Sequence, residues 1–402
     1  MSPRTRIVAQ TMAIALLSSF LGAAPARAED GRGFVTALWP EAQQRGISRS
    51  IFDEALGNFE PRPEVARLTR EQPEFAQSVG DYVTKRVDPR RIEEGRSKRA
   101  QWNETLEGIE RQYGVSRDVI LAVWGIETNF GSFLGGSNVP HSLATLTHKG
   151  YREAFFREEL LTALEILDDG HIRANAMVGS WAGAMGQTQF MPTSFRTFAV
   201  DHDGDGKANI WTSVPDALAS TANYLKQNGW RSGETWGYEI ELPAGFDFPA
   251  AWATEKATIS RWAGMGIARP SGASFPRRDD LARLYLPTGS DGPAFLLLAN
   301  FDVIKRYNNA DTYALSVGHL ADRIRGGGAF AQAWPQGQMA LTRDQRRELQ
   351  TSLGAMGFDA GAPDGIVGPR TRFAILSYQQ QAGMKADGHP SADLLRRIRG
   401  SK

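Results

Sequence analysis

The sequence contains no cysteine among its 402 residues. This absence excludes disulfide bonds, a cysteine nucleophile and a lipid anchor on cysteine. The six histidines form no H-E-x-x-H motif and no spacing typical of a metal site, and the chain has no G-x-S-x-G turn. These absences count against a zinc amidase and against a serine hydrolase.

Long apolar runs are also missing, except near the start of the chain. Arg4 and Arg6 precede an apolar run over residues 7–21, and Ala26-Arg27-Ala28 matches an A-x-A cleavage site. The alternative is a short membrane anchor, but the run is short for a bilayer and has no stop-transfer flank. We therefore expect a signal peptide at residues 1–28, cleaved after about Ala28, no membrane anchor, and a periplasmic location.

An excess of basic charge is absent as well. The formal net charge is +1, and residues 1–28 carry three arginines and no acidic residue, so the mature chain would carry −2. Proteins that bind nucleic acid usually carry a basic surface that neutralises phosphates. We therefore expect no nucleic-acid partner.

The composition changes along the chain and indicates several parts. Residues 231–295 are rich in Gly, Pro and aromatics and contain the alternating run YEIEL, which predicts a small strand-bearing insertion in an otherwise helical chain. Residues 326–338 have the composition of a linker, and about 60 residues with three short helical patterns follow. We expect a mainly α (α+β) protein. Its expected parts are a helical domain at 29–325, a linker at 326–339 and a small three-helix domain at 340–402.

One carboxylate lies inside an apolar stretch, WGIETNFG. If the preceding residues form a helix that Gly131 ends, Glu127 shares one face with Ile120, Val123 and Trp124. Poor solvation there favours the neutral acid, which can donate a proton to a leaving group. The alternative is a structural Glu paired with an Arg or with a helix N-terminus, and this stretch alone does not decide between the two.

Two uncharged polar stretches are candidates for binding a sugar. GSWAGAMGQTQFMP combines small residues with Ser180, Gln187 and Gln189, which can bond to hydroxyl and acetamide groups. The alternative is a tight contact between helices. In KRYNNADTYA, Tyr307 and Asn308 could reach a polar ligand, or they could simply end a helix.

The stretch DHDGDGKANIW matches the start of an EF-hand calcium loop. Asp201, Asp203 and Asp205 occupy positions 1, 3 and 5, and Lys207 would offer its carbonyl at position 7. Thr212 stands at position 12, where a bidentate Glu is expected, so the closing ligand must come from elsewhere. The alternative is an Asp- and Gly-rich turn that binds no ion.

Five stretches together resemble the B-type lytic murein transglycosylases, which have a goose-lysozyme-like catalytic core. They are GIETNFG, SWAGAMGQTQFMPTSF, DHDGDG, ANYLKQNGW and RYNNADTYALSV, in this order across roughly residues 34–325. The tail, with APDGIVGPRTRFAI and KADG, resembles a three-helix peptidoglycan-binding domain. Many relatives stop after the catalytic core and carry a lipid-anchoring cysteine. Here we expect a wall-binding domain in place of that anchor, and a monomer that binds peptidoglycan glycan strands.

The resemblance implies a role for each matching residue. Glu127 is implied as the sole catalytic acid and base. The implied substrate-binding residues are Ser180, Gln189, Tyr224, Tyr307, Asn308 and Tyr82. The implied ligands for a calcium or sodium ion are Asp201, Asp203, Asp205, Lys207 and Asp216, with Asp216 filling the gap left by Thr212. No cofactor is expected to be required.

The implied reaction cleaves the β-1,4 bond between MurNAc and GlcNAc without water. Protonated Glu127 donates to the glycosidic oxygen and then takes the proton of the same sugar's C6 hydroxyl, which closes on C1 as a 1,6-anhydro end. One alternative is a hydrolytic muramidase, which needs a second acid, with Glu153, Glu158 and Glu159 as candidates. Another is a non-catalytic scaffold that binds the wall through its tail.

Overall fold

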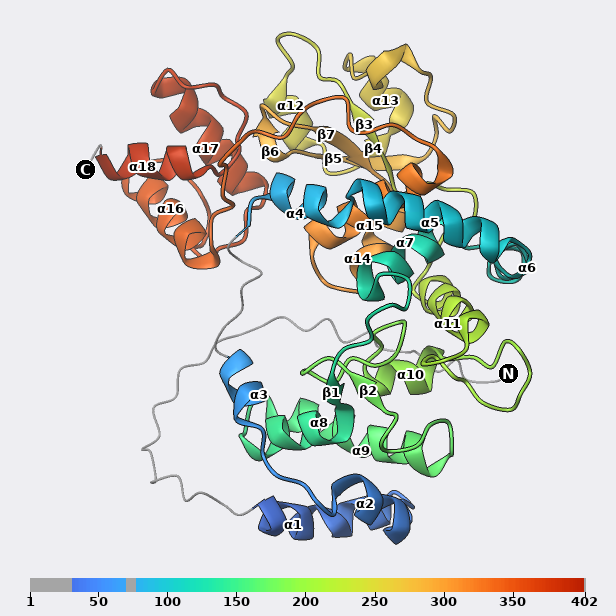
Figure 1. The fold of residues 1–402 in the computed structure, drawn as a ribbon. Coiled ribbons are helices and arrows are strands. Elements are labelled where there is room, and N and C mark those ends of the chain that lie inside the picture. Colours follow the sequence, from blue (N-terminus) through green and yellow to red (C-terminus); the bar gives the residue numbers. More distant parts are fainter. Residues whose placement is uncertain (1–30, 70–76, 401–402) are drawn as a thin grey trace, which may run out of the picture.

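The computed structural model describes residues 31–69 and 77–400, and every structural statement below concerns these ranges. The expected signal peptide therefore lies outside the described residues. The chain forms two helical lobes, a strand-bearing insertion and a terminal three-helix domain (Figure 1). Within the described ranges, no helix combines the length and the apolar character needed to cross a membrane.

The lower lobe in Figure 1 is all helical and surrounds a core of its own. The long helices α8 and α9 pack against each other through buried residues such as Leu143, Leu160 and Leu164. The helices of this lobe are α1 (Gly31–Gln44), α2 (Arg49–Leu56), α3 (Pro63–Leu68), α8 (Val139–His148), α9 (Glu153–Asp168) and α10 (Pro192–Phe198).

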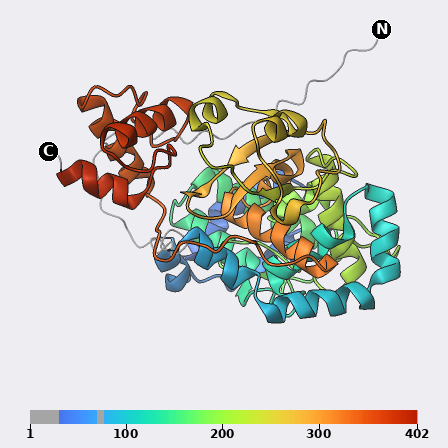
Figure 2. The same cartoon turned by 90° about the horizontal axis from the view of Figure 1, so that it is seen from above.

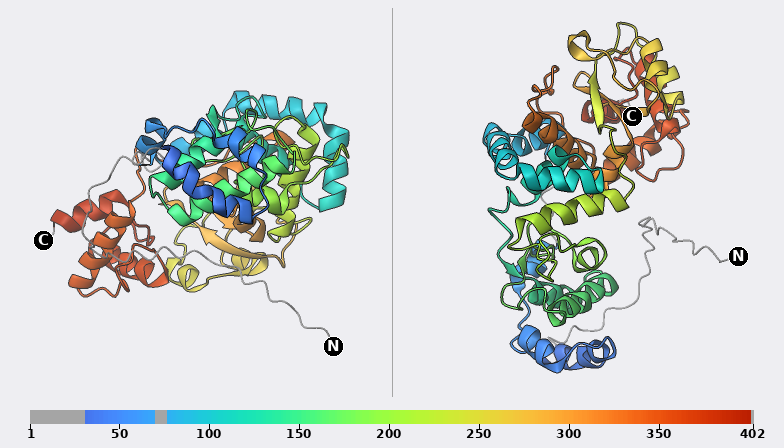
Figure 3. Two further views of the ribbon diagram at one scale, coloured as in Figure 1. Left: turned by 90° about the horizontal axis from the view of Figure 1, so that it is seen from below. Right: turned by 90° about the vertical axis from the view of Figure 1, so that its right-hand side faces the viewer.

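The upper lobe is built around α7, a helix buried on almost every side. All residues from Asp118 to Ile126 are buried, because α5, α6, α11 and α15 all pack against this helix. The helices of this lobe are α4 (Val79–Arg86), α5 (Pro89–Gln101), α6 (Asn103–Tyr113), α7 (Arg117–Thr128), α11 (Val214–Gln227), α14 (Ala299–Lys305) and α15 (Asp311–Arg325). The right-hand view of Figure 3 shows the two lobes stacked one above the other. A short antiparallel pair, β1 (Ser137–Asn138) and β2 (Val178–Gly179), lies between them in Figure 1.

The predicted strand-bearing insertion is confirmed. Its antiparallel sheet has the order β3-β7-β5-β4. Strand β7, between β3 and β5, is buried on both faces. Phe295 and Leu297 join the core of the upper lobe, while Leu296 joins a separate core under the insertion. The elements of the insertion are β3 (Gly237–Ile240), α12 (Phe248–Ala253), β4 (Ala257–Thr258), α13 (Ile259–Gly264), η2 (Pro270–Gly272), β5 (Leu281–Tyr285), β6 (Pro287–Ser290) and β7 (Ala294–Leu297).

The terminal domain has the three helices expected from the sequence, α16 (Arg343–Ala355), α17 (Pro369–Gln381) and α18 (Ala392–Gly400). Thr342 and Gln345 form a capping box at the start of α16, and Gly357 follows its end with φ of 88°. Figure 2 shows the domain at one side of the molecule, beside the insertion.

The segment between α15 and α16 runs over the upper lobe and is in contact with its core. Phe330 stacks on His319 with ring centroids 3.7 Å apart, and Trp334 packs against Phe330 and Phe295. The sequence pattern indicated a linker here, but the aromatic rings give the segment apolar area to bury. The segment is therefore packed on the core over part of its length.

Candidate active site

Glu127 lies in the last turn of α7, partly exposed at the end of a buried helix. The sequence predicted that this helix runs to Gly131, and this boundary is wrong by three residues. Asn129, Phe130 and Gly131 all have left-handed backbone angles, with φ of 49°, 57° and 78°. Left-handed non-Gly residues cost roughly 1–2 kcal/mol each. The Phe130 ring offsets this cost by packing edge-on against Trp124, with centroids 5.6 Å apart.

The end of α7 is hydrogen-bonded to the Gln-rich stretch. Trp124 Nε1 donates to Gln187 Oε1 at 3.0 Å, and the Thr128 hydroxyl donates to the Gln187 carbonyl at 3.1 Å. A Cβ on Gly131 would lie 2.4 Å from Gln187 Oε1, so only glycine fits this close approach. Because Gln187 is buried and its bonds are satisfied, the stretch is fixed relative to Glu127.

Tyr313, in the first turn of α15, contacts the Glu127 carboxyl group directly. Its hydroxyl donates to Glu127 Oε1 at 2.6 Å, and its side chain is 1% exposed. Burial, together with the negative charge of Glu127, raises the pKa of Tyr313 well above its ordinary value. The hydroxyl therefore stays protonated and remains a donor at neutral pH. Sequence analysis missed Tyr313, although it stands in the RYNNADTYALSV stretch that carried part of the resemblance.

Two of the predicted substrate-binding tyrosines, Tyr307 and Tyr224, form a row of aromatic rings with Tyr313. The Tyr307 ring is nearly parallel to that of Tyr313, with centroids 6.3 Å apart, and the Tyr224 ring is 4.7 Å from Tyr307. The Tyr307 hydroxyl donates to the Thr188 carbonyl at 2.8 Å. Both Tyr224 and Tyr307 pack against the cores of both lobes. The site therefore lies where the two lobes meet.

The other four predicted substrate-binding residues are Ser180, Gln189, Tyr82 and Asn308. Ser180 Oγ accepts from the Ala184 amide at 3.0 Å, and Gln189, with φ of 51°, donates to the Leu134 carbonyl at 3.1 Å. Tyr82 is partly exposed, and the Arg86 guanidinium lies over its ring at 5.2 Å. Asn308 is exposed. The binding roles of these residues remain predictions.

The three acids considered as a second carboxylate all have partners within the lower lobe. Glu158 forms an ion pair with Arg45, and Glu153 lies 3.7 Å from the Arg157 guanidinium. Glu159 accepts from the Thr193 amide at 2.9 Å and from its hydroxyl at 2.8 Å, at the first turn of α10. Glu159 is thus a buried acid that holds the first turn of α10, whereas Glu153 and Glu158 are exposed and form surface ion pairs.

The loop at residues 201–211 brings three carboxylates together. Asp201, Asp203 and Asp205 are exposed and place one oxygen each within 4.8 Å of the others. Asp216 is outside this group. It is fully buried, and its carboxylate accepts from the amides of His202 at 2.8 Å and Asn209 at 2.8 Å. The structure thus places Asp216 where it holds the loop backbone, while its role as a direct ligand stays a prediction.

The chain matches known proteins over most of its length. A family model described as a transglycosylase SLT domain matches residues 30–322, and a model for a peptidoglycan binding domain matches residues 342–398. Membrane-bound lytic murein transglycosylase B of Escherichia coli is 34% identical over 249 residues, which cover 60% of this chain and 66% of that protein. The match thus spans just under two thirds of that relative's length.

Solved structures show the same similarity. SltB3 from Pseudomonas aeruginosa in complex with NAG-anhNAM-pentapeptide is 46% identical, with a TM-score of 0.85, covering 92% of this chain and 100% of that one. Escherichia coli Slt35 in complex with calcium is 28% identical, with a TM-score of 0.60, covering 73% of this chain and 92% of that one.

The fold and the matches define a lysozyme-like, mainly helical lytic transglycosylase joined to a peptidoglycan binding domain. The chain belongs to the transglycosylase SLT domain family of lytic murein transglycosylases, enzymes that act on peptidoglycan as lyases.

Proposed function

We propose that Glu127 is the single acid and base with which this lytic transglycosylase cleaves the MurNAc–GlcNAc bond. The observation that carries the proposal is the 2.6 Å hydrogen bond from the buried Tyr313 hydroxyl to Glu127 Oε1. It fixes one carboxyl oxygen at the end of a rigid helix, at the junction of the two lobes. A fixed carboxyl group beside a protonated donor is suited to general acid–base catalysis.

In the proposed reaction Glu127 gives up one proton and takes one back. Protonated Glu127 donates its proton to the glycosidic oxygen as the bond from C1 of MurNAc to that oxygen breaks. The carboxylate then takes the proton of the C6 hydroxyl of the same sugar, and that oxygen bonds to C1. The Tyr313 hydroxyl is already oriented toward Oε1, so it stabilises the negative charge as it develops on Glu127. No water is consumed.

One carboxyl group is sufficient for this reaction because the nucleophile is part of the substrate. A hydrolytic enzyme needs a second carboxylate to position or replace a water. The acids proposed for that task hold Arg45, Arg157 and the first turn of α10. The complex of the SltB3 relative with a NAG-anhNAM fragment, a 1,6-anhydro sugar, also supports the non-hydrolytic reaction.

The proposal assigns the remaining residues as follows. Tyr224 and Tyr307 form an aromatic wall of the sugar site, and Ser180, Gln189, Asn308 and Tyr82 bind polar groups of the glycan strand. Residues 29–325 form the catalytic domain and residues 340–402 the wall-binding domain. The chain acts as a periplasmic monomer after residues 1–28 are removed, and it has no lipid anchor because it has no cysteine.

A calcium ion fits the loop of Asp201, Asp203 and Asp205. Calcium prefers carboxylate oxygens, and three exposed carboxylates lie close together here. Asp216 supports them because its carboxylate accepts hydrogen bonds from the loop amides of His202 and Asn209. A relative, Slt35, was crystallised in complex with calcium. In this proposal the ion stabilises the loop and takes no part in the reaction.

The direct test of the proposed role is Glu127→Gln, which keeps the shape of the side chain and removes its acid function. We expect this variant to release no muropeptides from purified peptidoglycan while it still binds the insoluble wall. The matched control is Glu153→Gln, since Glu153 is an exposed acid paired with Arg157, and it should retain full activity. Residual turnover by Glu127→Gln close to that of the wild type would overturn the assignment.

A further inference from the structure

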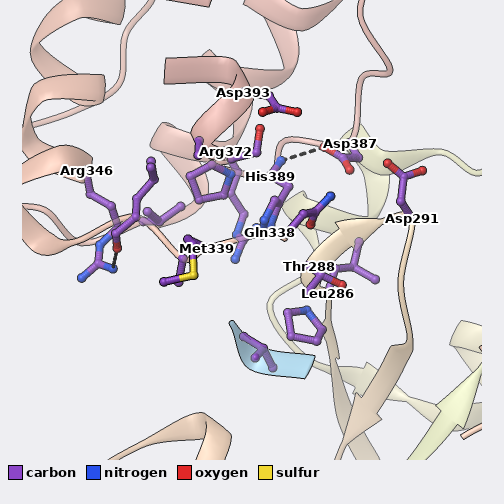
Figure 4. A pocket seen from close by; sticks show the side chains of 18 of the residues that line it. Leu286, Thr288, Asp291, Gln338, Met339, Arg346, Arg372, Asp387, His389 and Asp393 are labelled. Carbon is purple, nitrogen blue, oxygen red and sulfur yellow. Dashed lines mark hydrogen bonds between the residues drawn. The ribbon is translucent and has the colours of Figure 1, made fainter. Parts of the chain in front are cut away.

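Four large apolar side chains are exposed among the described residues, and Phe133, at 70%, is the most exposed of them. Of the other three, Leu281 stands in β5, and Met339 and Ile366 line the cavity between the insertion and the terminal domain, where Figure 4 labels Met339. Phe133 instead lies in the segment between α7 and β1. A single exposed apolar side chain is common in soluble proteins, so its position decides whether it has a function.

The backbone at Phe133 is anchored to the end of the catalytic helix. The Phe133 amide donates to the carbonyl of Thr128, the residue after Glu127, at 3.1 Å. The Ser132 amide donates to the Asn129 carbonyl at 3.3 Å, and Asn129 Nδ2 donates to Ser132 Oγ at 3.0 Å. These bonds fold the residues after α7 into a turn that holds Phe133 beside Glu127.

The same segment contacts the Gln-rich stretch through the residues that follow Phe133. Gln189 Nε2 donates to the Leu134 carbonyl at 3.1 Å. A Cβ on Gly135 would lie 2.8 Å from the Ser180 backbone nitrogen, so only glycine permits this close approach. The segment therefore runs from the end of α7 to two of the residues proposed to bind the glycan strand, and Phe133 lies between them.

The surroundings of Phe133 favour a neutral ligand that has an apolar face. Residues 128–138 contain no charged side chain. The pyranose rings of a β-1,4-linked glycan carry their substituents equatorially, so each face of a ring presents axial C–H groups. Such a face packs well on an aromatic ring, which offers a large, flat apolar surface.

We propose that Phe133 is a stacking platform for one pyranose ring of the glycan strand, at the edge of the site that contains Glu127. The inference rests on the proposed function, because it takes peptidoglycan glycan as the substrate of this site. Phe133 has no group that can transfer a proton, so it contributes through binding alone. It holds a sugar of the strand while Glu127 acts on the glycosidic bond.

The test measures binding by the full chain carrying Glu127→Gln, with a peptide-free oligosaccharide of GlcNAc and MurNAc and with a free stem pentapeptide as probes. In calorimetry, adding Phe133→Ser should weaken oligosaccharide binding by about 5- to 30-fold, which corresponds to about 1–2 kcal/mol. Its peptide affinity and unfolding midpoint should not change, since the ring is exposed. Leu281→Ser, which removes an exposed apolar side chain from the insertion, is the matched control and should alter neither affinity.

Phe133→Trp gives a second measurement that does not depend on loss of binding. The larger ring should bind the oligosaccharide at least as tightly as Phe133 does. Its fluorescence should shift to shorter wavelength on binding, because the sugar displaces water from the indole. The shift is read as the difference from the Glu127→Gln parent, which has the ten native tryptophans, and Leu281→Trp should show none.

Unchanged oligosaccharide affinity in Phe133→Ser, or no fluorescence shift in Phe133→Trp at saturating oligosaccharide, overturns the proposal. A loss of affinity for the peptide alone also overturns it, because the ring would then contact the peptide stem. Failure of the catalytic proposal is seen separately, as new products that the Glu127→Gln parent releases. It cannot imitate a loss of affinity that is confined to Phe133→Ser.

Discussion

Removing the Tyr313 hydroxyl tests how the structure activates Glu127. In Tyr313→Phe the ring stays in the same buried position, 1% exposed, and only the 2.6 Å hydrogen bond to Glu127 Oε1 is lost. A hydrogen bond to a charged group contributes about 1.5–3 kcal/mol, and each 1.36 kcal/mol changes a rate tenfold. We therefore expect kcat to fall roughly 10- to 150-fold, with KM changed little, because the carboxylate charge develops only during the reaction.

The pH profile separates this role from a purely structural one. A hydroxyl that donates to a carboxylate favours its ionised form, so Glu127 in Tyr313→Phe should keep its proton to higher pH. The basic limb of kcat should therefore move to higher pH in muropeptide-release assays on a soluble glycan. Tyr378→Phe makes the same change at a buried tyrosine of the terminal domain and should leave rate and profile unaltered. A Tyr313→Phe enzyme with wild-type kcat and an unshifted profile would refute the reasoning.

Three further predictions follow from other parts of the chain. Gly131→Ala should lower the unfolding midpoint by about 1–3 °C and reduce activity, because φ is 78° and the new Cβ would lie 2.4 Å from Gln187 Oε1. Gly108→Ala, in an open helical position, should not destabilise the protein. Burial lowers the pKa of His319 to about 3 from 6.5, so its contribution to stability is complete above pH 6.5 and declines by about 1.4 kcal/mol per pH unit below it. Denaturant titrations from pH 7 to 4 should show a shallower loss for His319→Gln, and equal slopes would contradict this. A calcium chelator should lower the wild-type midpoint but not that of Asp203→Asn, and an unchanged wild-type midpoint would mean that the loop binds no ion.

The sequence predicted those features that depend on the pattern of neighbouring residues along the chain. Glu127 was recognisable as a candidate because a carboxylate at the end of an apolar helical face is unusual, although that stretch alone left a structural role open. The third helix of the terminal domain was identifiable from its own pattern. The end of α7 was misplaced because the left-handed Asn129 and Phe130 depend on packing against Trp124. Two non-Gly residues in that conformation have no clear signal in the sequence.

Tyr313 and the interdomain cavity depend on contacts between distant segments. Tyr313 is 186 residues from Glu127 in sequence, and only the packing of α15 on α7 brings the two side chains together. The position of Arg372 against Trp252 likewise requires the docking of α17 on α12. The composition of residues 326–338 indicated a linker, and it did not reveal that the rings of Phe330 and Trp334 are packed on the core.

Digestion in water labelled with heavy oxygen shows whether one carboxyl group cleaves the glycan without water. Purified peptidoglycan is digested by the wild-type enzyme, and the released muropeptides are weighed by mass spectrometry. We expect 1,6-anhydro ends that lack the mass of water and carry no label. Reducing ends that have gained one labelled oxygen would contradict it and would establish hydrolysis instead.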